Sequence, residues 1–182
     1  RPYQLGTSSG SHSTRCAGTI FSGSSVVDHH NTAGFGAGAI IAIYTQSGDR
    51  QVQSIAYSTD NGRSFIKYEN NPVLVSEAND FRDPKVFWYA PGKHWVMILA
   101  GGQEMDIYSS KNLKEWKYES SFGAKQGAHG GVWECPDLVE LPVEGTKEKP
   151  LGAYLQHQSG RAVRRECRTV LCRYIQWQKV RE

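Results

Sequence analysis

The chain has 182 residues, which is enough for one domain with a sizeable hydrophobic core and too few for a second domain to be expected. It contains no run of about twenty apolar residues, so no membrane-spanning helix is expected. Its net charge is +3, but seven lysines and arginines and only two acids lie in residues 151–182, so residues 20–150 are acidic.

The predicted elements are strands throughout. The 19 glycines, 9 tyrosines and 5 tryptophans favour strands and turns over helices. Segments of strand length recur about every ten residues, and turn signals such as Asn61-Gly62 and Pro91-Gly92 separate them. The predicted strands lie in residues 19–28, 37–46, 51–60, 63–68, 83–90, 94–102, 104–110, 117–123 and 132–143.

A weak internal repeat distinguishes between two all-β architectures. Evenly spaced short strands are typical of a β-sandwich or a β-propeller. Residues 55–73 and 106–122 share one pattern: an apolar residue, Tyr, Ser, a polar turn, and then an aromatic residue, Lys and Tyr. The copies are about fifty residues apart, which suits a four-stranded propeller blade. The repeat therefore favours a propeller.

Charged residues stand at the start of otherwise apolar strands. In a propeller, the innermost strand of each blade begins near a central funnel, so Asp83 and Glu134 would converge there, with Asp28 as a third candidate. Glycoside hydrolysis needs two carboxyl groups, and aromatic rings would complete a sugar pocket: Phe21, Trp88 and Trp133. The alternative is a structural salt bridge, an N-cap or a solvent-facing turn at the same positions.

Four segments together resemble glycoside hydrolase family 32, which contains the invertases, inulinases and levanases. They are residues 21–28, 53–74, 81–88 (FRDPKVFW) and 133–138 (WECPDL). The resemblance covers residues 20–148. It implies a five-bladed β-propeller followed by a β-sandwich, and retaining hydrolysis of β-fructofuranosyl bonds.

The resemblance implies a role for each matching residue. Glu134 would be the general acid/base, and Asp83 would stabilise the transition state by gripping fructose hydroxyls. Cys135 would lie beside Glu134 and tune it rather than form a disulfide. The other expected substrate-binding residues are Arg82, Phe21, Ser22 and Trp88. No cofactor and no metal site are expected, because the histidines are scattered.

One departure from the family pattern concerns the nucleophile. The family nucleophile is an Asp in an Asn-Asp-Pro-Asn-Gly loop on the first blade, and this motif is absent from the 182 residues. Asp28 does not lie in that context. We therefore expect about three blades of the propeller, with the first blade incomplete and the C-terminal part missing, and no activity from the fragment alone.

Both ends depart from the resemblance. When residues 1–14 are back-translated and read from the second base, permitted codons give a segment that resembles the family sequence just before residue 21. The same shift from about residue 150 gives "INPGGPSGGS", which resembles its continuation. The sequence therefore predicts a partial propeller in residues 19–149, between out-of-frame segments in residues 1–18 and 150–182 that should lack a consistent strand pattern.

This hypothesis also bears on charge and disulfides. The basic tail would not be a binding arm, so no nucleic acid or membrane partner is expected. Four cysteines could form two disulfides in a secreted chain, with three possible connectivities. Under the hypothesis, Cys16, Cys167 and Cys172 carry no information, and only Cys135 is secure.

The leading functional prediction is a fragment of a secreted, exo-inulinase-like or levanase-like β-fructofuranosidase that acts on inulin, levan or sucrose. Within the same chemistry, an invertase or a fructosyltransferase is the alternative. From another class, the alternative is a non-catalytic sugar-binding propeller that retains Asp83 and Glu134.

Overall fold

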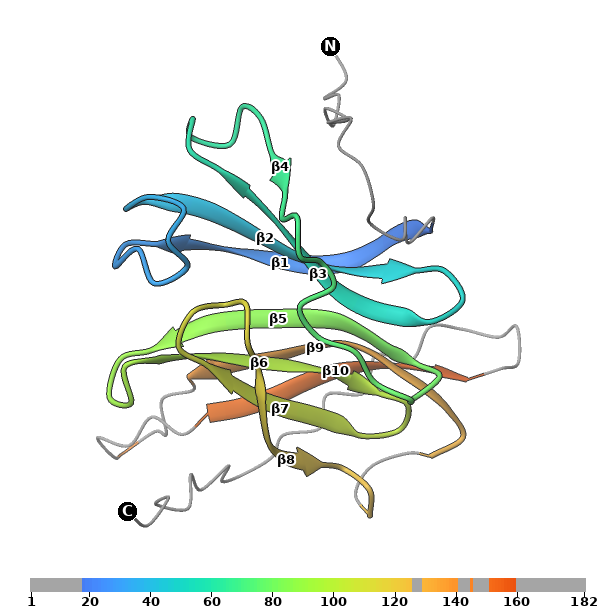
Figure 1. Ribbon diagram of the computed structural model, residues 1–182. Coiled ribbons are helices and arrows are strands. Elements are labelled where there is room, and N and C mark those ends of the chain that lie inside the picture. Colours follow the sequence, from blue (N-terminus) through green and yellow to red (C-terminus); the bar gives the residue numbers. More distant parts are fainter. Residues whose placement is uncertain (1–17, 126–128, 141–144, 146–150, 160–182) are drawn as a thin grey trace.

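The computed structural model describes residues 18–125, 129–140, 145 and 151–159. Ten strands and no helices form this described part, as the all-β prediction requires (Figure 1). Within it, no helix could span a membrane. The strands are β1 (Thr19–Asp28), β2 (Ala39–Ser47), β3 (Gln51–Ser58), β4 (Ile66–Lys67), β5 (Phe81–Tyr89), β6 (His94–Gly101), β7 (Met105–Ser110), β8 (Lys117–Phe122), β9 (Gly131–Glu140) and β10 (Leu151–Ser159).

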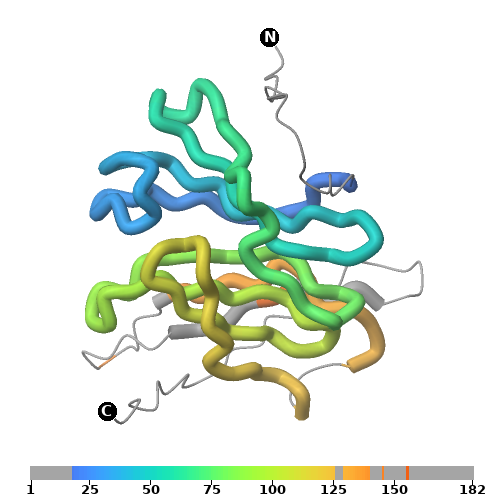
Figure 2. Tube along the Cα trace, in the orientation of Figure 1, coloured from blue at the N-terminus to red at the C-terminus, as the bar shows by residue number. Residues whose placement is uncertain are grey.

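The strands form three antiparallel sheets in which each strand pairs with the next along the chain. Sheet A contains β1–β4, sheet B contains β5–β8, and sheet C contains β9 and β10. The sheets follow one another in sequence, and sheet A lies above sheet B in the view of Figure 2. Sheet C packs against sheet B through a shared hydrophobic cluster. Their first strands are neighbours, because β5 contacts both β1 and β9. A four-stranded meander of this kind is the form of a propeller blade.

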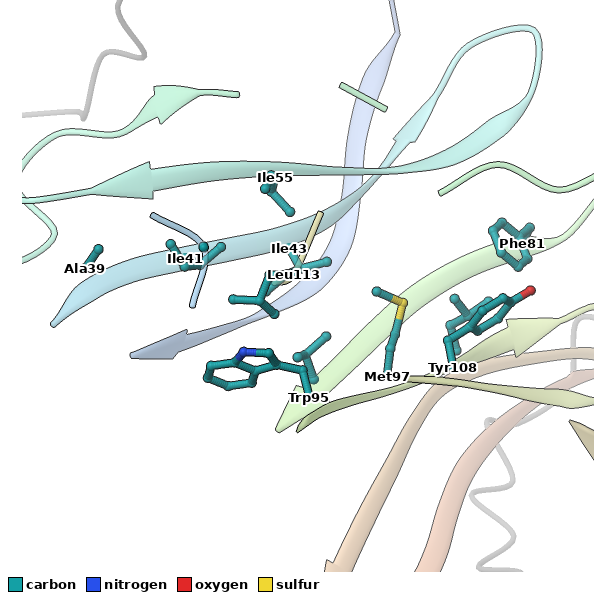
Figure 3. Packing of buried hydrophobic residues seen from close by; sticks show 12 residues of the cluster. Ala39, Ile41, Ile43, Ile55, Phe81, Trp95, Met97, Tyr108 and Leu113 are labelled. Atoms are coloured by element: carbon teal, nitrogen blue, oxygen red, sulfur yellow. The ribbon is translucent and has the colours of Figure 1, made fainter. Parts of the chain in front are cut away.

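The largest hydrophobic cluster lies between sheets A and B (Figure 3). From β2 it takes Ile41 and Ile43, which are two residues apart and therefore share one face of the strand. From β6 it takes Trp95, Met97 and Leu99 on the same principle. All five side chains are almost fully buried.

A second cluster lies between sheets B and C. The alternate residues of β6, Val96 and Ile98, point away from sheet A and pack with Trp133, Leu138 and Leu155. Strand β6 is thus buried on both faces. This explains why the segment Trp95–Ala100 is continuously apolar, because a strand with one solvated face would alternate.

The predicted repeat forms two corresponding connections, β3–β4 and β7–β8. In each, a serine at the end of the first strand accepts hydrogen bonds from loop amides: Ser58 Oγ from Gly62 N–H at 2.9 Å, and Ser110 Oγ from Leu113 N–H at 2.9 Å. Strand β4 is shorter than predicted. The reason is that Ser64 donates both its N–H and its hydroxyl to the Asp60 carboxylate, at 3.0 and 2.7 Å, so this part of the chain belongs to the loop.

One expectation about the C-terminal segment is wrong. Residues 150–182 were expected to lack a strand pattern, yet Leu151–Ser159 forms β10 and pairs with β9. The physical reason is that the open edge of β9 supplies backbone partners, and Leu155, only 2% exposed, is buried in the second cluster. The remaining segments of this expectation, and Cys16, Cys167 and Cys172, lie outside the described residues; the frameshift hypothesis itself stays a prediction.

The stacking of sheets B and C predicts a large loss of stability from Ile98→Ala. Ile98 is fully buried, so its truncation should lower the free energy of unfolding by about 2–5 kcal/mol in urea denaturation. Ile66 is 54% exposed on β4, so Ile66→Ala should change the free energy by no more than about 0.5 kcal/mol. Equal losses for the two variants would contradict this packing.

Candidate active site at three strand bulges

A pocket of about 410 Å³ lies where the first strands of the three sheets meet. Two consecutive residues from each strand line it: Phe21 and Ser22 from β1, Arg82 and Asp83 from β5, and Glu134 and Cys135 from β9. Six of the seven residues predicted for catalysis or substrate binding are therefore together. Trp88 is the exception.

Each of these strands carries an irregularity at the level of the pocket. The ladder between β5 and β6 is regular at Arg82 and again at Lys85, and it omits the two residues between them. The ladder between β1 and β2 omits Phe21 and Ser22, and that between β9 and β10 omits residues 135–136. A β-bulge re-aims side chains and ends local pairing, so the three bulges allow two consecutive side chains from each strand to face one space.

The three bulges share a short sequence form. Phe21-Ser22-Gly23, Arg82-Asp83-Pro84 and Glu134-Cys135-Pro136 each end in glycine or proline. Proline lacks the amide that a regular ladder would use. At Gly23 a Cβ atom would collide with the carbonyl oxygen of Ile43, so only glycine lets β2 approach this closely.

Two of the pocket residues have left-handed backbone conformations. The φ angles of Asp83 and Cys135 are 62° and 47°. This conformation is uncommon for residues other than glycine and costs about 1–3 kcal/mol at each position. Four other described residues outside the pocket also have positive φ angles, namely Asn31, Asn61, Lys93 and Leu113, whereas Asp83 and Cys135 lie in the pocket, where strain is expected at a functional site.

Arg82 connects the charged groups of the site. Its Nη2 atom lies 3.0 Å from Glu134 Oε1, and its Nη1 atom lies 2.5 Å from Asp80 Oδ1. Burial alone lowers the pKa of Arg82, but hydrogen bonding and charge from Asp80 and then Glu134 raise it above its ordinary value. The guanidinium therefore stays charged and holds Glu134 at the pocket. Asp80 is not among the site residues predicted from the sequence, where its only signal is an acid two residues before Arg82.

Asp83 connects β5 to β9. Its Oδ2 atom accepts a hydrogen bond from the Cys135 N–H at 2.9 Å and lies 3.6 Å from Cys135 Sγ. Cys135 is a free thiol. Burial raises the pKa of this thiol, and the negative Asp83 carboxylate raises it further. Lys85 and Asp137, one residue beyond each bulge, form a second link between the strands at 3.0 Å.

Three residues considered for the funnel lie elsewhere. Trp88 follows Asp83 by five residues, roughly 16 Å along an extended strand, and packs on Trp95 with ring centroids 5.1 Å apart. Trp133, next to Glu134, points to the opposite side of β9 and is buried in the second cluster. Asp28, fully buried at the far end of β1, caps the β1–β2 turn by accepting N–H groups of residues 32 and 33 at 3.0 and 2.8 Å.

The described residues contain no group of three or more His, Cys, Asp or Glu side chains placed to hold a metal ion. The polar groups of the pocket are instead two carboxylates, a guanidinium, a hydroxyl and a thiol. Such a set can bind sugar hydroxyls and transfer a proton.

The raised pKa of Cys135 predicts slow alkylation near neutral pH. Because the thiolate is the reactive form, its reaction with iodoacetamide should accelerate only at a pH above that of an unperturbed thiol. Asp83→Asn removes a nearby negative charge and should move the profile toward lower pH. Peptide mass spectrometry across a pH series measures both rates. An unchanged profile in Asp83→Asn would contradict the contact.

Comparisons with known proteins place the chain in a family. Residues 9–174 match the family model described as the glycosyl hydrolases family 32 N-terminal domain. The levanase of Bacillus subtilis (strain 168) is 62% identical over 133 residues, which are 70% of this chain and 20% of the levanase. An extracellular exo-inulinase of Meyerozyma guilliermondii is 47% identical over 138 residues, which are 71% of this chain and 26% of the inulinase.

Solved structures give the same result. The fructofuranosidase of Schwanniomyces occidentalis, complexed with fructose, superposes with a TM-score of 0.72 and 43% identity, over 79% of this chain and 30% of that one. The exo-inulinase of Aspergillus awamori gives a TM-score of 0.67 and 32% identity, over 84% of this chain and 37% of that one. The present chain thus spans only about a fifth to somewhat more than a third of the length of these relatives. The chain belongs to glycoside hydrolase family 32.

Proposed function

We propose that this chain is part of the catalytic domain of a retaining, exo-acting β-fructofuranosidase that releases fructose from inulin, levan or sucrose. The observation that carries the proposal is the meeting of Asp83, Glu134 and Arg82 in one pocket, built by bulges of adjacent strands. Relatives named levanase, exo-inulinase and invertase support the substrate class.

The pocket chemistry suits a furanose ring. Asp83 and Glu134 can accept hydrogen bonds from sugar hydroxyls, and Arg82 can donate them. Phe21 is 41% exposed and offers an aromatic surface to the apolar side of the ring. Two related structures hold fructose and fructosylnystose, which supports fructose recognition by this chain.

Each residue has a distinct role in the proposed reaction. Glu134 donates a proton to the glycosidic oxygen as the bond to fructose breaks, and later accepts a proton from the attacking water. The Asp83 carboxylate accepts hydrogen bonds from fructose hydroxyls, and these hydrogen bonds strengthen as positive charge develops on the ring. Arg82 orients Glu134 through the 3.0 Å contact.

Retaining hydrolysis also needs a carboxylate nucleophile. Asp83 and Glu134 are the only carboxylates among the described residues that line the pocket, and Asp28 is buried at the other end of β1. The Asn-Asp-Pro-Asn-Gly motif implied by the family resemblance is absent from the 182 residues. We therefore expect the isolated chain to bind fructose without hydrolysing fructosides, and the full-length protein to hydrolyse them.

The proposal extends to architecture and location. Sheets A and B would be two blades of a five-bladed propeller, and β9 and β10 would begin a third. The extracellular exo-inulinase among the relatives supports a secreted protein. An invertase or a fructosyltransferase would use the same pocket with different acceptor contacts. One further candidate from another class is a sugar-binding propeller without catalysis that retains Asp83 and Glu134.

The acid/base role predicts the behaviour of Glu134→Gln in the full-length protein that contains this chain. Loss of the proton donor should lower kcat for sucrose and inulin about 10²–10⁴-fold, while the Kd for fructose should change little. Stopped enzyme assays measure the first quantity, and calorimetric titration measures the second.

A matched control is Glu119→Gln on β8, whose carboxylate contacts Ser109 and Lys117 away from the pocket. Its kcat should equal that of the unmodified protein. Full hydrolysis by Glu134→Gln would refute the acid/base assignment. If the unmodified full-length protein binds fructose but never hydrolyses fructosides, the sugar-binding candidate is correct.

A further inference from the structure

The bulge of β5 removes Asp83 and Pro84 from the ladder between β5 and β6. Between Arg82 and Lys85, β5 does not pair with β6, and the left-handed φ of Asp83 turns its amide out of the sheet. An unpaired backbone group in this buried strand would be costly. The partners come from side chains of sheet A.

Thr45 and Gln53, both fully buried, form a directed chain of hydrogen bonds to β5. The Asp83 N–H donates to Thr45 Oγ1 at 2.9 Å. The Thr45 hydroxyl then donates its own proton to Gln53 Oε1 at 3.0 Å, and Gln53 Nε2 donates to the carbonyl of Phe81 at 2.8 Å. The chain thus begins and ends on β5, on either side of Arg82.

A second hydroxyl completes the support. Ser24 Oγ on β1 donates to the carbonyl of Pro84 at 2.9 Å and accepts from the Val86 N–H at 3.0 Å. Backbone groups of β5 on both sides of Asp83 are thereby bound to sheet A. The Asp83 carboxylate is bound from the opposite side, by the Cys135 N–H.

We propose that Thr45 and Gln53 are positioning residues that hold the Asp83 carboxylate in its ligand-binding orientation. They touch no ligand themselves, since neither lines the pocket. Without the Thr45 hydroxyl, the N–H of Asp83 would have no hydrogen-bond partner. The backbone of Asp83 would then relax from its left-handed conformation toward a regular strand, and its side chain would point in a different direction. What Asp83 binds rests on the proposed function; how Asp83 is held does not.

The test compares Thr45→Val and Thr45→Ser in the 182-residue chain. Valine keeps the volume and removes the hydroxyl, whereas serine keeps the hydroxyl. In Thr45→Val, the Asp83 amide should exchange with solvent at least about tenfold faster, and the Kd for fructose should rise about tenfold. Thr45→Ser should restore both quantities to within about twofold of the unmodified chain.

A double variant tests whether the Asp83 amide is the group that depends on Thr45. Thr45→Val leaves the Gln53 carbonyl without its donor, and adding Gln53→Leu removes that oxygen but also the donor to the Phe81 carbonyl, so the double variant should be no more stable than Thr45→Val. Fructose affinity should not recover, because the Asp83 amide still has no partner. The matched control is Ser54→Ala. It removes a hydroxyl that lies on the opposite face of β3 from Gln53 and donates to Gln46 on β2, so it should leave Asp83 unaffected.

The outcomes are distinct. Recovery of fructose affinity in the double variant would overturn the inference, and so would an unchanged Asp83 amide in Thr45→Val. If the unmodified chain binds no fructose, the proposed function fails, and the exchange of the Asp83 amide alone still decides whether Thr45 holds the bulge.

Discussion

The departure of β5 from its ladder at Asp83 is the constraint on which the site depends. A regular strand would place Arg82 and Asp83 on opposite faces of sheet B, and only one of them could then face the pocket. The bulge allows both to line it, at the expense of a left-handed residue and unpaired backbone groups. The hydroxyls of Thr45 and Ser24 in sheet A pair with the backbone of the strand, and an amide of β9 pairs with the Asp83 carboxylate.

The packing of the sheets makes this pairing possible. Strand β6 is buried on both faces, so sheet B is fixed against sheet A on one side and sheet C on the other. This packing fixes the positions of β1, β5 and β9 relative to one another, so that their bulges lie beside the same pocket. Groups that are distant in the sequence, such as Thr45, Asp83 and Cys135, can form hydrogen bonds of 2.9 Å because the hydrophobic clusters set the spacing of the strands.

The sequence predicted the strands well because their periodicity is local. Segments such as residues 19–28 alternate or run apolar between clear turn signals, and β1 has those bounds. The motifs also predicted which residues share the pocket, apart from Trp88. The failures concern tertiary context. Trp133 is adjacent to Glu134 but points to the other face, and Leu151–Ser159 forms a strand because β9 offers an edge. Thr45 and Gln53 look like ordinary strand residues until β5 is placed beside them.

If the three bulges form one fructose site, fructose should perturb residues of all three at once, and a residue-resolved titration measures this. Amide NMR spectra of the chain would be recorded while fructose is added. The amides of Ser22, Asp83, Glu134 and Cys135 should shift together with a single Kd. Shifts confined to another surface, such as the stacked rings of Phe35 and Tyr57, with the bulge amides unchanged, would contradict a fructose site at the bulges.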